Sequence, residues 1–248
     1  MIILKSNDEL SRMARACKIV AEALQGLKEV VRPGVTTAEL DSYVESFIRK
    51  RGAIPAFKGY RGYPASLCTS VNDQVVHGIP SARRLGEGDI ISLDLGVYLD
   101  GFYGDAAISL PVGSVGPEAK RLLQITEEAL YRGIDMARVN KRVSDISNAI
   151  QGFVEAAGYS VVRHFVGHGI GMELHEDPQV PNFGPPGQGP VLKEGMTLAI
   201  EPMVNRGGCE IAILDDGWTA VTKDGSLSAH FEHTVAVTNN GPSILTKI

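Results

Sequence analysis

IISLDLGVYLDGFYGDAAISL, residues 90–110, is the stretch that decides the fold. Apolar residues alternate with polar or small residues through its first nine positions, which is typical of a β-strand. The dipeptide Asp100-Gly101 is a strong signal for a two-residue hairpin turn, and a second strand-like run follows it. The stretch therefore predicts an antiparallel hairpin.

The turn also predicts which residues of the hairpin face one another. Pairing across it places Asp94 opposite Ala107, so Asp94 and Asp105 point to the same side of the sheet. Diagonal neighbours of this kind have Cβ atoms within about 7–8 Å of each other. Two carboxylates aimed together into a sheet repel each other, and each loses several kcal/mol of hydration free energy, roughly. A bound cation would relieve both penalties.

Internal similarity extends this pattern to the rest of the chain. Four segments of the first part align, in the same order, with four segments of the second: 39–52 with 145–158, VVHGIP at 75–80 with VGHGIG at 166–171, EGDIISLD at 87–94 with EGMTLAIE at 194–201, and DAAISL at 105–110 with EHTVAV at 232–237. We therefore predict a duplicated α/β unit, a single domain made of two related halves at about 1–110 and 111–248.

The second half supplies two further acids, Glu201 after the apolar run MTLAI and Glu232 inside HFEHTVAV. A pseudo-twofold arrangement would bring the four acids to one centre, where two divalent cations would cancel their charge. Oxygen ligands with one or two imidazoles suit Mn, Fe, Co or Zn. The duplication offers His77 and His168 as equivalent imidazole candidates. The sequence thus predicts a two-metal site.

Helices and a loop complete the predicted layout. Capping signals and apolar spacing predict three helices, one after Ser6 that ends before Pro33, one after Thr36 that ends near Gly52, and one from Pro117 to about Met136. The Gly/Pro-rich segment 178–190 is expected to be an irregular loop.

Composition excludes several classes of protein. The chain has 248 residues, 24 Lys and Arg against 29 Asp and Glu, and a net charge of −5, so extended nucleic-acid binding is not expected. Three widely spaced cysteines indicate a reducing compartment. Neither a signal peptide nor a long apolar run is present, so we expect a cytoplasmic protein without membrane association.

Ordinary structural roles compete with these interpretations. An Asp beside an Asp-Gly turn is usually a capping or solvated residue, and a lone His is more often a satisfied core or surface residue, as His164, His230 and His233 could be. Aromatic residues in a turn-rich stretch are usually packing residues. The duplicated pattern, together with acids on the polar side of apolar strands, favours the metal site.

Several motifs resemble the methionine aminopeptidases, specifically the short type I bacterial form. The resemblance covers nearly the whole chain and rests on KGYRGYPASLCTSVNDQVVHGIP, ISLDLGVYLDGFYGDAA, VGHGIGMELHEDPQVPN, TLAIEPMV, DDGWTAVTKDGSLSAHFEHT and NNGPSILT. It implies the pita-bread α/β fold, in which antiparallel sheets are covered by helices. It also implies a dinuclear centre (Co, Mn, Fe or Zn) with bridging Asp105 and Glu232, with Asp94 on one ion, and with His168 and Glu201 on the other.

The resemblance further implies a reaction. The family removes the N-terminal methionine of nascent proteins that have a small second residue, by attack of a metal-bridging hydroxide. Glu201 would shuttle the proton, His175 would stabilise the oxyanion, and His77 would contact the scissile amide or the departing residue. A monomer that associates transiently with the ribosome is expected.

The same resemblance implies two further sites. The methionine side chain would lie among Phe57, Tyr60, Tyr63, Cys68, His77, Leu174 and Trp218, and His175 would also contact the substrate. Positions 57, 61 and 174 are Phe, Arg and Leu where some relatives have Cys, His and Phe, which leaves the pocket depth and rim charge open. A Na or K ion would lie near Asn72 and Ser228, mostly on backbone oxygens.

Two other classes of protein, the proline-specific peptidases and non-catalytic binding modules, can be distinguished from a methionine aminopeptidase by sequence. Proline-specific peptidases and creatinase share the implied fold, but they normally carry a large extra N-terminal domain. The catalytic pattern begins so early in this sequence that such a domain is not expected before it. A non-catalytic binding module would have lost ligands, whereas this chain keeps all five together with His77 and His175. The chain also lacks a Cys/His-rich N-terminal extension and a long insert between His168 and Glu232, which argues against the zinc-module and type II forms.

Overall fold

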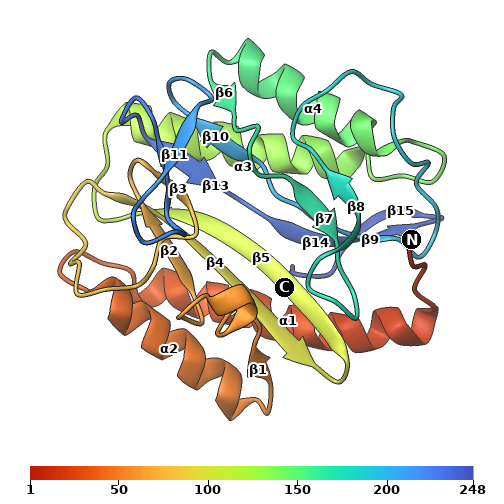
Figure 1. Ribbon diagram of the computed structural model, residues 1–248, viewed down its shortest axis with the longest axis horizontal. Helices are drawn as coiled ribbons and strands as arrows, with labels where there is room; N and C mark the ends of the chain where they lie inside the picture. The colour runs from red at the N-terminus through yellow and green to blue at the C-terminus, as the bar shows by residue number, and fades with distance from the viewer. Residues whose placement is uncertain (248) are drawn as a thin grey trace.

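The computed structural model describes residues 1–247. Its four long helices are α1 (Asn7–Val30), α2 (Thr37–Lys50), α3 (Pro117–Asp135) and α4 (Val143–Ala156). Figure 1 shows α1 and α2 along one side of the view and α3 and α4 along the opposite side, with the strands between the two pairs. The three predicted helices are confirmed within a few residues, and the duplication accounts for the fourth.

The first part of the chain contributes five strands, β1 (Ile54–Pro55), β2 (Cys68–Val71), β3 (Gln74–Val76), β4 (Ile90–Leu99) and β5 (Phe102–Pro111). β4 pairs with β1, β2 and β5, and β3 pairs with β12 (Ala220–Thr222), which also pairs with β11 (Ile211–Ile213). All these pairs are antiparallel. A short 3-10 helix, Tyr60–Gly62, lies between β1 and β2.

The second part builds two more antiparallel sheets. One has the order β13-β10-β6, from Ser228–His230, Met203–Asn205 and Ser160–Val161. The other has the order β15-β14-β9-β7-β8, from Gly241–Ile244, His233–Thr238, Thr197–Ile200, Gly167–Gly169 and Glu176–Val180. Apolar clusters pack α1 and α2 on the β4–β5 side and α3 and α4 on the β9–β14 side.

The predicted hairpin is confirmed in its turn and in its register. Asp100 and Gly101 both have positive φ, 51° and 88°, as a two-residue type I′ turn requires. Asp94 lies opposite Ala107, and Asp105 lies opposite Gly96. The two acids are therefore diagonal neighbours on one side of the sheet.

Matching hydrogen bonds support the predicted duplication. The carboxylate of Glu39 accepts the Thr36 amide at 2.7 Å, and Asp145 accepts the Arg142 amide at 2.8 Å, so α2 and α4 begin in the same way. The residue before each cap also accepts a matching hydrogen bond. The Leu85 amide donates to the Val35 carbonyl at 2.9 Å, and the Leu192 amide donates to the Lys141 carbonyl at 2.8 Å. A boundary between the halves near residue 110 stays a prediction.

One boundary predicted from the sequence is wrong. Residues 178–180 of the expected irregular loop 178–190 belong to β8, where Gln179 pairs with His168 and Val180 pairs with Gly167. β8 is the edge strand of its sheet, so Pro178 removes no hydrogen bond that a further strand would need. The Gly/Pro-rich composition of 178–190 hides this strand.

No helix within residues 1–247 has the length and apolar character needed to cross a membrane.

Candidate metal centre and substrate pocket

Five predicted ligands line one cavity of about 180 Å³. Asp94 lies on β4, Asp105 on β5 and His168 on β7. Glu201 directly follows β9, and Glu232 directly precedes β14. Strands from both halves of the chain therefore converge on this cavity, and each half contributes two acids.

Reciprocal backbone hydrogen bonds join the two halves beside the acids. The Glu232 amide donates to the Ala107 carbonyl at 2.9 Å, and the Ala107 amide donates back at 3.4 Å. Ala107 is also the residue opposite Asp94. A second link comes from Thr234, whose hydroxyl donates to the Asp105 carbonyl at 2.7 Å. These bonds bring Glu232 to the Asp94–Asp105 pair.

The donor set fits divalent cations. Ligand atoms of Asp105, His168 and Glu232 lie within 4.8 Å of one another, and all three residues are buried. Asp94 Oδ1, Asp105 Oδ1 and Glu232 Oε1 are buried and have no hydrogen-bond partner among residues 1–247. Buried carboxylate oxygens are normally paired. Three unpartnered oxygens in one pit therefore match a site that coordinates cations.

The electrostatics of the pit lead to the same conclusion. Burial raises the pKa of Asp94 to about 7. Burial and then neighbouring carboxylates raise the pKa values of Asp105, Glu201 and Glu232 well above their usual range. Without positive charge the pit therefore retains protons at neutral pH, and a cation would replace them.

His168 is oriented as a metal-ligating histidine. Its Nδ1 lies 2.9 Å from the Gly169 carbonyl, which accepts a hydrogen from Nδ1 and leaves a lone pair on Nε2. Nε2 lies 3.4 Å from Glu201 Oε1. Burial, and then the nearby His175, lower the pKa of His168 to about 3, so the imidazole is neutral. His168 lies beside Asp105 and Glu232, and its role as the ligand in place of His77 stays a prediction.

His175 and His77 lie on the walls above the acids. The His175 ring is 4.2 Å from the His168 ring between centroids, and its Nδ1 lies 2.8 Å from the Tyr60 hydroxyl. His77 packs edge-on against Phe165 and Trp218 at 5.1 and 6.3 Å. Burial, and then His175, lower the pKa of His77 to about 4, so this ring is neutral as well.

Every residue predicted for the methionine pocket lines the same cavity, and so does Arg61 at its rim. Tyr63 packs edge-on against Trp218 at 5.2 Å, and its hydroxyl donates to the Gly78 carbonyl at 2.9 Å. Burial raises the pKa values of Tyr63 and Cys68, so both groups are neutral. The wall beside the acids is therefore apolar and uncharged.

The sequence interpretation missed several lining residues, above all His230. Its Nε2 is buried without a hydrogen-bond partner among residues 1–247, so it is not the satisfied histidine of the ordinary interpretation. His230 lies two residues before Glu232, and residues at that spacing in extended chain point to the same side. This spacing is a signal that could have placed His230 beside Glu232. Val76, Phe165, Val166 and Met203 also line the cavity and carry no comparable signal.

Asn72 and Ser228 lie together, as a shared cation site requires. The Ser228 amide donates to the Asn72 carbonyl at 2.9 Å. The side chain of Asn72 is already engaged, since Nδ2 donates to Asp89 and Oδ1 accepts the Ile90 amide. Any cation here would therefore depend mainly on backbone oxygens.

The chain is similar to known proteins in both sequence and structure. The model of metallopeptidase family M24 matches residues 11–239. A methionine aminopeptidase of Clostridium perfringens is 59% identical over 248 residues, which is all of both chains. The crystal structure of a methionine aminopeptidase from Thermotoga maritima is 48% identical, with a TM-score of 0.99 and complete coverage of both chains.

A more distant solved structure bears on the proline-specific alternative. A prolidase from Pyrococcus horikoshii superimposes on the whole chain with a TM-score of 0.81 and 25% identity, but the match covers only 64% of the prolidase. The fold is thus shared between the two activities, and the pocket residues must distinguish them.

Proposed function

The chain belongs to the methionine aminopeptidases of metallopeptidase family M24, and from that premise we propose how its pit and pocket remove the N-terminal methionine of proteins. Asp94, Asp105, His168, Glu201 and Glu232 would hold two divalent ions. The unpartnered carboxylate oxygens of the pit carry this proposal.

Bound divalent ions would supply Lewis acidity, lowering the pKa of water and polarising the scissile carbonyl. Mn, Fe, Co and Zn all suit this ligand set, and availability in the cell decides among them. Glu201 is the residue we assign to proton transfer. Its carboxylate lies in the pit beside His168, where it can accept a proton during the reaction.

His175 is assigned to the oxyanion of the tetrahedral intermediate. When the Tyr60 hydroxyl donates to Nδ1, the imidazole carries its hydrogen on Nε2 and can donate it to a developing negative charge. His77 is assigned to the scissile amide or the departing residue, from the wall it shares with Trp218. Both rings act as neutral donors or acceptors.

The apolar wall would receive the methionine side chain. Phe57, Tyr63, Cys68, Leu174 and Trp218 present neutral surface next to the acids. A pocket of this kind discriminates against one missing methylene by only about 1–3 kcal/mol. We propose a preference for substrates with a small second residue.

Three finer assignments accompany this function. We propose that a Na or K ion binds near Asn72 and Ser228, because their backbones meet there. We also propose that the chain works in the cytoplasm as a monomer that meets nascent chains at the ribosome. Size-exclusion chromatography with light scattering tests the oligomeric state, and co-sedimentation with ribosomes tests the association.

The deciding experiment compares two peptides. Purified protein treated with a chelator and then supplied with Mn²⁺, Fe²⁺ or Co²⁺ is expected to release methionine from a Met-Gly-peptide and to leave an Xaa-Pro-peptide intact. Cleavage of the Xaa-Pro-peptide alone would assign the chain to proline-specific peptidases. Cleavage of neither peptide with any of the three metals would favour a binding module.

A further inference from the structure

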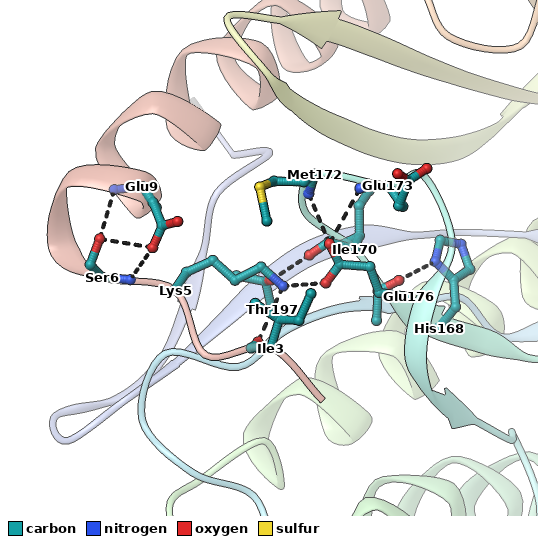
Figure 2. A network of polar contacts seen from close by, with 11 residues as sticks. Ile3, Lys5, Ser6, Glu9, His168, Ile170, Met172, Glu173, Glu176 and Thr197 are labelled. Atoms are coloured by element: carbon teal, nitrogen blue, oxygen red, sulfur yellow. Dashed lines mark hydrogen bonds and ion pairs between the residues drawn. The ribbon is translucent and has the colours of Figure 1, made fainter. Parts of the chain in front are cut away.

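A buried ion pair lies behind the pocket wall, between Lys5 and Glu176. Their side chains are only 2% and 4% exposed, and no other Lys or Arg ion pair within residues 1–247 buries both partners. Lysine and glutamate are almost never fully buried unless they are paired. Figure 2 shows the pair with its contacts to the Ile3 carbonyl and to the amides of Met172 and Glu173.

Lys5 is fixed at its base by the backbone around it. Its amide donates to the Gly195 carbonyl at 2.7 Å, and a side chain at Gly195 would bring Cβ within 2.6 Å of the Lys5 carbonyl oxygen. The ammonium group also donates to the Ile3 carbonyl at 3.3 Å. The N-terminal segment therefore holds the cation at a defined place beside the second half of the chain.

Glu176 closes the connection between β7 and β8, residues 170–175. It is the first residue of β8, and its Oε1 accepts the amides of Met172 at 2.8 Å and Glu173 at 3.3 Å. Its Oε2 accepts the Lys5 ammonium. A side chain at Gly171 would overlap Lys5 Cε and reach within 2.6 Å of Glu176 Oε1, so the backbone of the connection packs directly against the ion pair.

The same connection carries two residues of the pocket. Leu174 lines it and is 1% exposed, and His175 lines it directly before Glu176. The opposite end of the connection is held by Ile170, whose amide donates to the Thr197 carbonyl at 3.1 Å and whose carbonyl accepts the Thr197 hydroxyl. Glu176 therefore holds the end of the 170–175 connection that carries His175.

We propose that Lys5, acting through Glu176, is a positioning residue that holds His175 and Leu174 in their working places. The proposal rests on the function assigned above to His175. Without the ammonium group, the Glu176 carboxylate would be buried beside two amides with no counter-charge, and the connection would have to open to hydrate it. His175 would then leave its place beside His168, although the metal ligands would stay where they are.

The test compares Lys5→Met, Glu176→Gln and the double variant, each loaded with Mn²⁺, with Met-Gly-peptide as substrate. We expect Lys5→Met to lower kcat by about 10- to 100-fold, the cost of a small misplacement, with a smaller change in KM and an unchanged Mn²⁺ affinity. The double variant is expected to recover most of that loss. The amide oxygen that Glu176→Gln introduces can still accept the two backbone amides, and no charge is left unpaired.

Nitrogen NMR of the imidazole rings supplies a second readout. In Lys5→Met we expect broadened or doubled His175 signals and unchanged His77 signals. Lys223→Met is the matched control, since it removes the same group from an exposed ion pair with Glu210 and should change neither readout. If Lys5→Met does not fold, Glu176→Gln alone is measured in the same way.

Wild-type kcat together with wild-type His175 signals in Lys5→Met would overturn the proposal. Loss of Mn²⁺ in step with kcat would overturn it as well, because the pair would then support the metal centre instead of His175. If the wild-type protein releases no methionine, the assigned function fails, and the His175 signals still decide whether the ion pair positions the ring.

Discussion

At the residue scale, an unpartnered buried carboxylate is the feature that most constrains what this protein does. Asp94 Oδ1, Asp105 Oδ1 and Glu232 Oε1 are buried in one pit without donors among the described residues. Each such oxygen costs free energy unless it is protonated or bound to a cation. Coordination explains all three oxygens at once.

The first prediction concerns Asp94. Asp94→Asn removes one negative charge from the ligand set, so we expect it to lose metal as well as activity. Loss of an outer-shell partner lowers metal affinity or activity by roughly 10- to 100-fold, and we expect a larger loss of both for Asp94→Asn. Metal analysis after dialysis and a Met-Gly-peptide assay check this, with the exposed Asp8→Asn as control. Two retained metals and near-normal turnover would contradict the ligand role.

His175 supports a contrasting prediction. His175→Ala is expected to keep both metals and to lower kcat by about 10²- to 10³-fold, because its proposed hydrogen bond forms in the transition state. The same metal analysis and steady-state kinetics check it. An equal loss of metal would instead assign His175 to coordination.

At the scale of elements, the β4–β5 hairpin carries the acids of the first half and packs against α1. Gly104 on β5 lies against α1, where an added Cβ would come within 2.8 Å of the Cys17 amide nitrogen. Gly104→Ala should therefore lower the free energy of unfolding by about 1–3 kcal/mol, as overpacking does. Gly152→Ala on α4 has open space around it and should stabilise by about 0.5–1 kcal/mol. Urea unfolding measures both, and equal stabilities would contradict the packing described.

Local elements could be predicted from the sequence because their signals are local. The Asp100-Gly101 turn set the register of β4 and β5, and the capping boxes set the start of α1 and α2. The repeat then placed the second pair of acids. Each of these inferences uses residues only a few positions apart, or a similarity that recurs along the chain.

Contacts between distant segments could not be predicted in this way. The Ala107–Glu232 hydrogen bonds and the Lys5–Glu176 ion pair join segments more than 100 residues apart, and no periodicity marks them. For the same reason the duplication left His77 and His168 equivalent. The placement of His230 at the pocket and the strand at 178–180 also depend on pairing partners that the local sequence does not reveal.

At the scale of the whole molecule, two halves are joined around a concentration of negative charge. The metal-free protein must therefore lose stability as the pit ionises. A carboxyl whose pKa is raised by folding contributes stability below its unfolded pKa of about 4, and that contribution is lost as the pH rises through its folded pKa, about 7 for Asp94. Asp105, Glu201 and Glu232 shift in the same direction.

The pH dependence is best measured between about pH 6.5 and about pH 7.5, as the pH rises through the pKa of Asp94. Buried histidines change the free energy of unfolding in the opposite direction, because folding lowers their pKa values, to about 3 for His168 and about 4 for His77. This opposing effect is confined to pH values below the unfolded histidine pKa of about 6.5. Urea unfolding of the metal-free protein should give a free energy that falls with pH in this window. Glu232→Gln should flatten the slope. A wild-type free energy that does not change with pH would contradict this prediction.

The most direct measurement is a crystal structure of the protein grown with Mn²⁺ and solved with anomalous scattering. We predict two anomalous peaks per chain, both among Asp94, Asp105, His168, Glu201 and Glu232, with Asp105 and Glu232 contacting both ions. A pit without anomalous density, or a single ion outside these five side chains, would contradict the account.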